Sequence, residues 1–104
     1  MALIKSCLAG AGGGTYNPTT IPSVSTGTGF TAEVDKHYII ALNVNNSSAT
    51  GATFSGFTID ATVASFTPSG SRQFVYVGTA TSTTVTANFV GTTESGTMYP
   101  CQLD

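Results

Sequence analysis

The chain has 104 residues, a formal net charge of −2 and charged residues at only 8% of positions, against about 25% in an average soluble domain. A chain of this length forms one domain. Three basic residues are too few for non-specific nucleic-acid binding or electrostatic anchoring to a membrane, so we expect neither partner. The longest apolar runs, such as residues 38–42, are too short to cross a bilayer.

The composition predicts an all-β protein. Hydrophobic residues make up 40% of the chain, and Thr, Ser and 12 Gly fill most polar positions. Thr favours strands and Gly favours turns, whereas segments rich in the residues that helices prefer are few. About seven short strands, spaced by about 10 residues, predict a single antiparallel β-sandwich or jelly-roll domain with an extended N-terminal arm.

The first part of the chain predicts a strand followed by an arm. Residues 3–8 alternate like a strand, and residues 10–29 are dominated by Gly, Thr, Ser and Pro, with Tyr16, Ile21 and Val24 as the larger apolar residues. Such a stretch cannot build its own core, and about twenty structureless residues usually act as a linker or a binding arm. Two interpretations stay open: an arm that lies across a neighbouring subunit, or a loose tail with a surface loop.

The domain division follows from this composition, with the strand and arm in residues 1–29 and the β-sandwich domain in residues 30–104. Residues 1–10 begin like a secretory signal, but Lys5 interrupts them and no apolar stretch of about 7–15 residues follows. We therefore expect a mature sequence that is made in the cytoplasm.

Two hairpins are predicted. The apolar residues of 30–34 and 38–44 share one face if a three-residue connection, residues 35–37, joins the two strands, and a two-residue connection gives a poorer match. The second hairpin spans residues 72–90, with a polar loop at 78–83. Its first strand puts Phe74 and Tyr76 on one face and Gln73, Val75 and Val77 on the other, and its second strand aligns Val85, Ala87 and Phe89.

Two further strands complete the pattern. Phe57, Ile59, Ala61 and Val63 alternate with polar residues and predict a strand with one apolar face. Residues 97–103 predict a last strand, and Pro100 indicates that this strand lies at the edge of a sheet.

Few residues of the sequence are candidates for metal binding or catalysis. Glu33, Asp35 and His37 would share one face of a continuous strand and could bind a metal ion there. The predicted connection breaks the strand at Asp35, so we expect solvated charges in a turn instead. His37 is the only histidine, and nothing in the sequence would activate Cys7 or Cys101 as a nucleophile beside it. We expect no enzyme and no cofactor.

The remaining candidates favour structural roles. Asp60 lies in the middle of a predicted strand, where we expect it to face solvent, and Gly-rich residues 10–14 do not precede a helix as a phosphate-binding loop would. Cys7 and Cys101 could form a disulfide if the first and last strands pair. In a cytoplasmic product both cysteines stay reduced, so we favour two thiols.

Residues 30–44 (FTAEVDKHYIIALNV) and 74–89 (FVYVGTATSTTVTANF), in a chain poor in charge, resemble small all-β modules of tailed-bacteriophage virions. Such modules include capsid decoration proteins and segments of tail or head fibres. The resemblance covers residues 30–103. It implies a structural component of the virion, assembled in the host cytoplasm and commonly trimeric, which docks on capsid or tail proteins through an extended segment, here residues 10–29.

Association would stabilise a small domain with apolar side chains on both strand faces, so we expect a homo-oligomer. The expected oligomer is a trimer. The interface candidates are Tyr16, Ile21, Val24, Phe74, Tyr76 and Tyr99. The alternative is a β-sandwich that binds a carbohydrate or a cell surface. The absence of Trp disfavours a surface glycan as partner, whereas an exposed cluster of Tyr16, Tyr99 and Asn residues would favour it.

Overall fold

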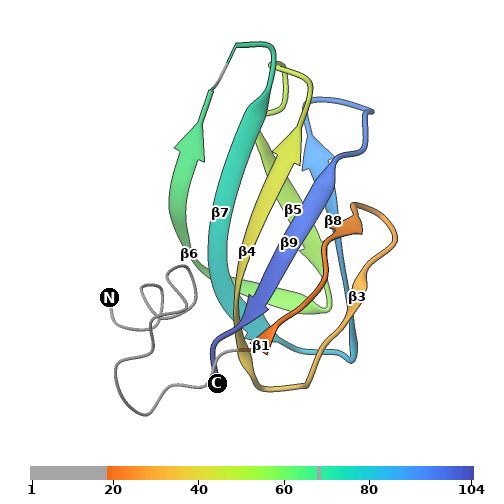
Figure 1. Ribbon diagram of the computed structural model, residues 1–104, viewed down its shortest axis with the longest axis vertical. Coiled ribbons are helices and arrows are strands. Elements are labelled where there is room, and N and C mark those ends of the chain that lie inside the picture. Colours follow the sequence, from red (N-terminus) through yellow and green to blue (C-terminus); the bar gives the residue numbers. More distant parts are fainter. Residues whose placement is uncertain (1–18, 68) are drawn as a thin grey trace.

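The computed structural model describes residues 19–67 and 69–104, which form nine strands and no helix (Figure 1). The strands are β1 (Thr19–Thr20), β2 (Val24–Ser25), β3 (Phe30–Thr31), β4 (His37–Val44), β5 (Gly51–Ser55), β6 (Phe57–Phe66), β7 (Arg72–Ala80), β8 (Thr84–Val90) and β9 (Thr97–Gln102). The predicted all-β class is confirmed. In this part of the chain no helix is long and apolar enough to cross a membrane.

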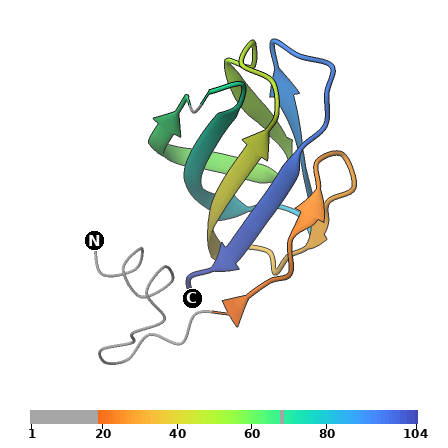
Figure 2. The ribbon, with the colours of Figure 1, turned by 45° about the horizontal axis from the view of Figure 1, so that its top comes forward.

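The strands form two antiparallel sheets. The large sheet has the order β1-β9-β4-β7-β6, with β2 also paired to β9, and the small sheet has the order β3-β8-β5. The small sheet lies behind the large one, and the two views show the two layers (Figures 1 and 2). Side chains from both layers form one core, so the arrangement is sandwich-like.

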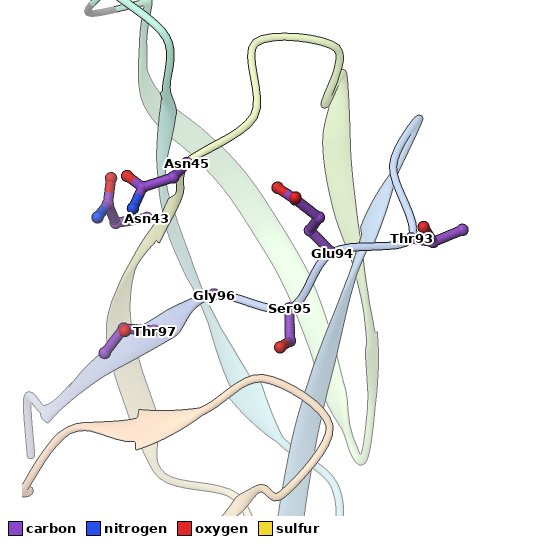
Figure 3. A pocket seen from close by; sticks show the side chains of 7 residues that line it. All are labelled: Asn43, Asn45, Thr93, Glu94, Ser95, Gly96 and Thr97. Atoms are coloured by element: carbon purple, nitrogen blue, oxygen red, sulfur yellow. The ribbon is translucent and has the colours of Figure 1, made fainter.

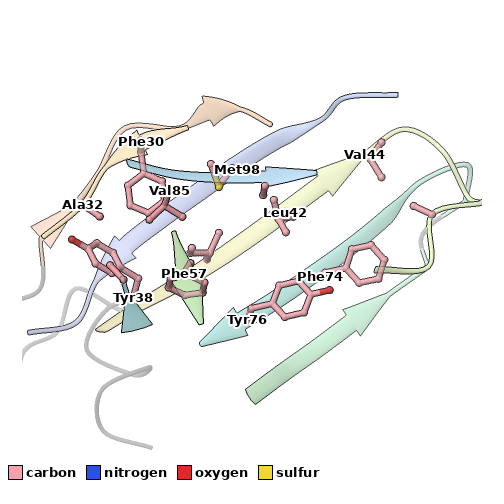
Figure 4. Close-up of a cluster of buried hydrophobic side chains, with 14 residues drawn as sticks. Phe30, Ala32, Tyr38, Leu42, Val44, Phe57, Phe74, Tyr76, Val85 and Met98 are labelled. Carbon is pink, nitrogen blue, oxygen red and sulfur yellow. The ribbon is translucent and has the colours of Figure 1, made fainter. Parts of the chain in front are cut away.

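The core is built on alternate residues of β4. Tyr38, Ile40, Leu42 and Val44 point between the sheets and are at most 1% exposed. Side chains from neighbouring strands and from the small sheet close around this row (Figure 4). They include Phe30 and Ala32, Phe57, Phe74 and Tyr76, Val85 and Ala87, and Met98.

Both predicted hairpins are wrong, although Phe30 and Ala32 do face the core together with Tyr38, Ile40 and Leu42. Val34, which was predicted on the same face, is 45% exposed. β7 pairs with β4 and β6, whereas β8 pairs with β3 and β5. Residues 81–83 therefore cross from one sheet to the other, and the Thr81 N–H donates to the Gly56 carbonyl oxygen at 2.8 Å. In the same way β3 and β4 follow one another in the chain but belong to different sheets. Alternation identifies the side of a strand that meets the core, but it does not identify the neighbouring strand.

The predicted strand at residues 57–63 is present as β6, but its apolar face is wrong. Only Phe57 is buried, while Ile59 and Val63 are 38% and 40% exposed. The register with β7 skips Asp60 and Val63, and each bulge of this kind turns the following side chains to the other face. β5 was not among the predicted strands.

Residues 19–29 pack on the domain that follows them. β1 and β2 pair with β9, and Ile21 and Val24 contact the core. β9 therefore has neighbours on both sides, and its predicted edge position is wrong. Pro100 is accommodated because its carbonyl oxygen accepts from the Ile21 N–H at 3.3 Å, so its missing N–H faces the break between β1 and β2. Residues 1–18, with Tyr16 and the predicted strand 3–8, lie outside the described residues.

Cys101 is buried and disulfide-bonded, so the expectation of a thiol at this position is wrong. That expectation was based on an inferred cytoplasmic compartment, which does not constrain how the strands bring sulfur atoms together. Cys7 lies outside the described residues.

A clamp joins the last residues to the start of β4. The His37 N–H donates to Asp104 Oδ1 at 2.7 Å, His37 Nδ1 lies 2.8 Å from Asp104 Oδ2, and the Leu103 N–H donates to the His37 carbonyl oxygen at 2.8 Å. Desolvation by partial burial raises the pKa of Asp104, but the hydrogen bonds from His37 outweigh it and hold the pKa below its ordinary value.

This clamp predicts that the stability of the fold decreases at acidic pH. Because the folded pKa of Asp104 is depressed, its stabilisation is present above the unfolded pKa of about 4 and is lost as the pH falls through the folded value. Wild type should therefore melt above the Asp104→Asn variant at pH 7, and the difference between the two melting temperatures should shrink as the pH is lowered below about 4. A difference that stays constant over this range would contradict the ionic contribution of Asp104.

The close contact of β6 with β7 at Gly78 gives a second prediction. A Cβ atom at Gly78 would strike the Thr58 carbonyl oxygen and lie 2.6 Å from the Phe57 ring. Gly78→Ala should therefore lower the free energy of unfolding by about 3 kcal/mol, measured by chemical denaturation. The control Ser69→Ala, in an exposed turn, should stay within about 0.5 kcal/mol of wild type. Equal denaturation midpoints for wild type and Gly78→Ala would contradict the close contact of β6 with β7.

Candidate functional site

The predicted interface residues separate into core and surface. Phe74 and Tyr76 are buried, and the Tyr76 hydroxyl accepts from the Ala52 N–H at 3.1 Å, which leaves these rings little surface for a partner. Burial raises the pKa of Tyr76, and its hydrogen bond from Ala52 opposes this shift only in part, so the hydroxyl stays protonated. Ile21 and Val24 are partly buried against the core.

The predicted acid and histidine cluster lies around a turn. Asp35 adopts a left-handed φ of 70°, and its N–H donates to the Ala80 carbonyl oxygen at 2.8 Å. The His37 ring is engaged with Asp104 instead of facing Glu33. Within residues 19–67 and 69–104, no three His, Cys, Asp or Glu side chains gather closely enough to hold a metal ion.

Asp60 is exposed on β6, as predicted. Its Oδ2 accepts a hydrogen bond from Thr79 Oγ1 at 3.0 Å. This contact joins β6 to β7 at the bulge and gives the carboxylate a structural role.

The outer face of the large sheet, which points away from the core, presents Tyr99 to solvent. Tyr99 is 50% exposed and lies directly opposite Ala41 in the β4–β9 ladder, while Asn43 lies opposite Thr97. Side chains opposite one another in such a ladder have Cβ atoms about 5 Å apart. These four residues therefore form one continuous block, with an aromatic ring at one end and polar groups at the other.

A polar hollow of about 650 Å³ opens beyond this block, between the end of β4 and the loop that precedes β9 (Figure 3). Amides, hydroxyls and one carboxylate face it. Its lining residues are Asn43, Asn45, Thr93, Glu94, Ser95, Gly96 and Thr97.

Most hydrogen-bonding groups of the polar hollow are unused by the protein. In the described part of the chain, the amides of Asn43 and Asn45 and the carboxylate of Glu94 bond to no other protein group. The backbone of the loop is fixed instead, since the Glu94 N–H donates to Thr92 Oγ1 at 3.1 Å. The hollow thus offers two amides and a carboxylate to a ligand.

Thr26 and Gly96 hold the wall of the hollow in place. The Thr26 N–H donates to the Gly96 carbonyl oxygen and the Gly96 N–H donates to Thr26 Oγ1, each at 2.9 Å. A Cβ atom at Gly96 would strike the Asn43 carbonyl oxygen and lie 2.7 Å from the Phe89 ring. Glycine at this position therefore lets the loop approach β4 closely enough to form the hollow.

An apolar groove of about 210 Å³ continues the polar hollow along the outer face. Asn43 lines both spaces, and Ala41 and Val75 lie between the strands that carry Tyr99 and Phe66. The Phe66 ring is 52% exposed on β6, at the opposite side of the groove from Tyr99. The two spaces together form a strip that changes from polar to apolar.

Of these residues, only Tyr99 was identified from the sequence. Asn43 interrupts the outward apolar series of β4 after Ile39 and Ala41, which was a usable signal. Glu94 and Thr97 carried no such signal, because only the β4–β9 ladder brings them to Asn43.

No protein-family model matches this chain, and neither a curated protein nor a solved structure is significantly similar to it. Its function therefore has to be inferred from the geometry of the described residues.

The loop anchor predicts the effect of removing one hydroxyl. Thr26→Val leaves the Gly96 N–H without its partner and should lower the free energy of unfolding by about 1–2 kcal/mol. Amide hydrogen exchange at Gly96 should accelerate in the variant. Thr93→Val, which removes an exposed hydroxyl from the same hollow, should change stability by less than about 0.5 kcal/mol. Unchanged exchange at Gly96 in Thr26→Val would contradict the anchoring role.

Proposed function

We propose that the protein is a non-enzymatic structural module that works by protein–protein assembly, as a capsid decoration or fibre component of a virion. The proposal includes a β-sandwich or jelly-roll fold, of the kind that such modules use. The partners are further copies of this chain, in a trimer, and capsid or tail proteins. The virion is its location, after assembly in the host cytoplasm.

The exposed edge of β6 is the observation that carries this proposal. β6 pairs with β7 on one side only, so the backbone groups of its other edge have no ladder partner in the large sheet. Ile59, Val63 and Phe66 are three of the six large apolar residues exposed in the described chain. β6 contains neither Lys nor Pro, two residues that protect such edges in monomeric proteins, although its bulges at Asp60 and Val63 bend the strand.

The edge also favours a homo-oligomer. Its single charged residue, Asp60, already accepts a hydrogen bond from Thr79, so little charge opposes the approach of a second chain. A closed trimer uses a heterologous contact, in which β6 of each copy meets a different surface of the next. Closure of the ring would cover every copy of the edge and would account for an apolar edge in a soluble particle.

A second candidate function is binding of a carbohydrate or a cell surface. The observation in its favour is the exposed Tyr99 ring beside Asn43 and the polar hollow. This block lies on β9 and β4, separate from the β6 edge. The two functions therefore centre on different strands, although Phe66 of β6 also lines the apolar groove beside Tyr99.

The assembly proposal predicts the solution mass. Size-exclusion chromatography with light scattering should give about three chain masses for wild type. Val63→Lys places a charge on the exposed edge and should yield a folded monomer, because Val63 is 40% exposed and its replacement leaves the core intact. Tyr99→Ala, on β9 and separated from β6 by two strands, should retain the wild-type mass. A wild-type monomer at micromolar concentration, or a trimer that survives Val63→Lys, would contradict assembly through β6.

A further inference from the structure

We propose that the outer face binds a neutral oligosaccharide, with the Tyr99 ring as its stacking platform and the amides of Asn43 and Asn45 as partners for its hydroxyls. The inference rests on the second candidate function above. It adds the ligand class and the residues that recognise it.

The Tyr99 ring is free to serve as a platform. It packs on no other aromatic ring in the described residues, and its hydroxyl bonds to no protein group there. The residue opposite it, Ala41, carries a single methyl group and leaves one side of the ring open toward the groove. An aromatic face is electron-rich, and the C–H groups on the apolar side of a sugar ring are electron-poor, so the two attract one another when stacked.

The polar groups match hydroxyls better than they match anions. Each Asn amide offers both donors and an acceptor, which suits the dual character of a sugar hydroxyl. Asn43 and Asn45 are two residues apart at the end of β4 and line one hollow (Figure 3). They meet neighbouring hydroxyls of a ligand without a conformational change of the backbone.

The charges around the hollow exclude an acidic ligand. Glu94 contributes a negative charge to its wall. The described cations are Lys36 and Arg72, and neither lines the hollow. The Arg72 guanidinium lies 5.1 Å from the Phe74 ring centroid and donates to Ser65 Oγ, so it is directed elsewhere. A carboxylate, sulfate or phosphate on the ligand would meet repulsion without a compensating cation.

The dimensions favour a chain over a single sugar. Tyr99 pairs with Ala41, and four residues of extended chain separate Ala41 from Asn45, a span of about 13 Å. This span is longer than one pyranose ring. A ligand that reaches both the platform and the amides is therefore an oligosaccharide, held by contacts that are few and exposed to solvent.

The test is a titration of the full chain, followed by saturation-transfer NMR, with four neutral trisaccharides and one acidic one. The neutral probes are maltotriose, cellotriose, N,N′,N″-triacetylchitotriose and mannotriose, and the acidic probe is sialyllactose. At least one neutral probe should bind, and sialyllactose should bind more weakly than that probe. Tyr99→Ala should weaken the binding by about tenfold, the loss of one stacking contact. Asn43→Ala should weaken the binding several-fold. Val63→Lys, on β6 at the edge of the sheet, should leave the binding unchanged.

Each contrary result has a distinct meaning. If none of the five probes binds, both this inference and the binding of a carbohydrate are wrong. A preference for sialyllactose would overturn the neutral ligand class but leave carbohydrate binding in place. Binding of a neutral probe that survives both Tyr99→Ala and Asn43→Ala would overturn the assigned site. The dispersion of the NMR spectrum of each variant checks that the fold is retained, as expected because the three replaced side chains lie outside the core.

Discussion

The inward row of β4 is the contact on which the rest of the structure depends. Tyr38, Ile40 and Leu42 lie between β9 and β7 within the large sheet and face the small sheet across the core. Burial of each such side chain contributes about 1.5–3 kcal/mol. Because side chains alternate along a strand, this row also fixes Ala41 and Asn43 on the outer face. The core thus determines which residues form the candidate site.

Tyr38 joins this core to the polar ends of the molecule. Its hydroxyl accepts from the Glu33 N–H at 2.8 Å and lies 3.2 Å from Gln102 Oε1, to which it donates. Desolvation by burial raises the pKa of Tyr38, with the hydrogen bond from Glu33 opposing it, so the hydroxyl stays protonated and keeps its role as a donor. One side chain therefore ties the turn before β4 to the last strand.

The sequence predicted which side of a strand faces the core better than it predicted which strands pair. Phe30 and Ala32 were correctly placed on the same face as Tyr38, Ile40 and Leu42, because a period of two reports directly on burial. Phe74 and Tyr76 were predicted as interface residues and are buried in the core instead. The pairing of β7 with β8 was wrong, since two facing strands and two adjacent strands show the same alternation. The bulges of β6 could not be predicted, because no residue type marks them. The polar hollow was missed for a similar reason: its residues meet only through the β4–β9 ladder.

In the proposed function, the large sheet carries an apolar β6 edge for assembly and a polar block around Tyr99 for a ligand. A soluble paramagnetic agent, added to protein labelled on methyl groups and aromatic rings, measures both surfaces in one experiment. We expect the methyl signals of Ile59 and Val63 to keep their intensity in the assembled protein while the Tyr99 ring signals broaden. Equal broadening of the signals of all three residues would contradict assembly through β6.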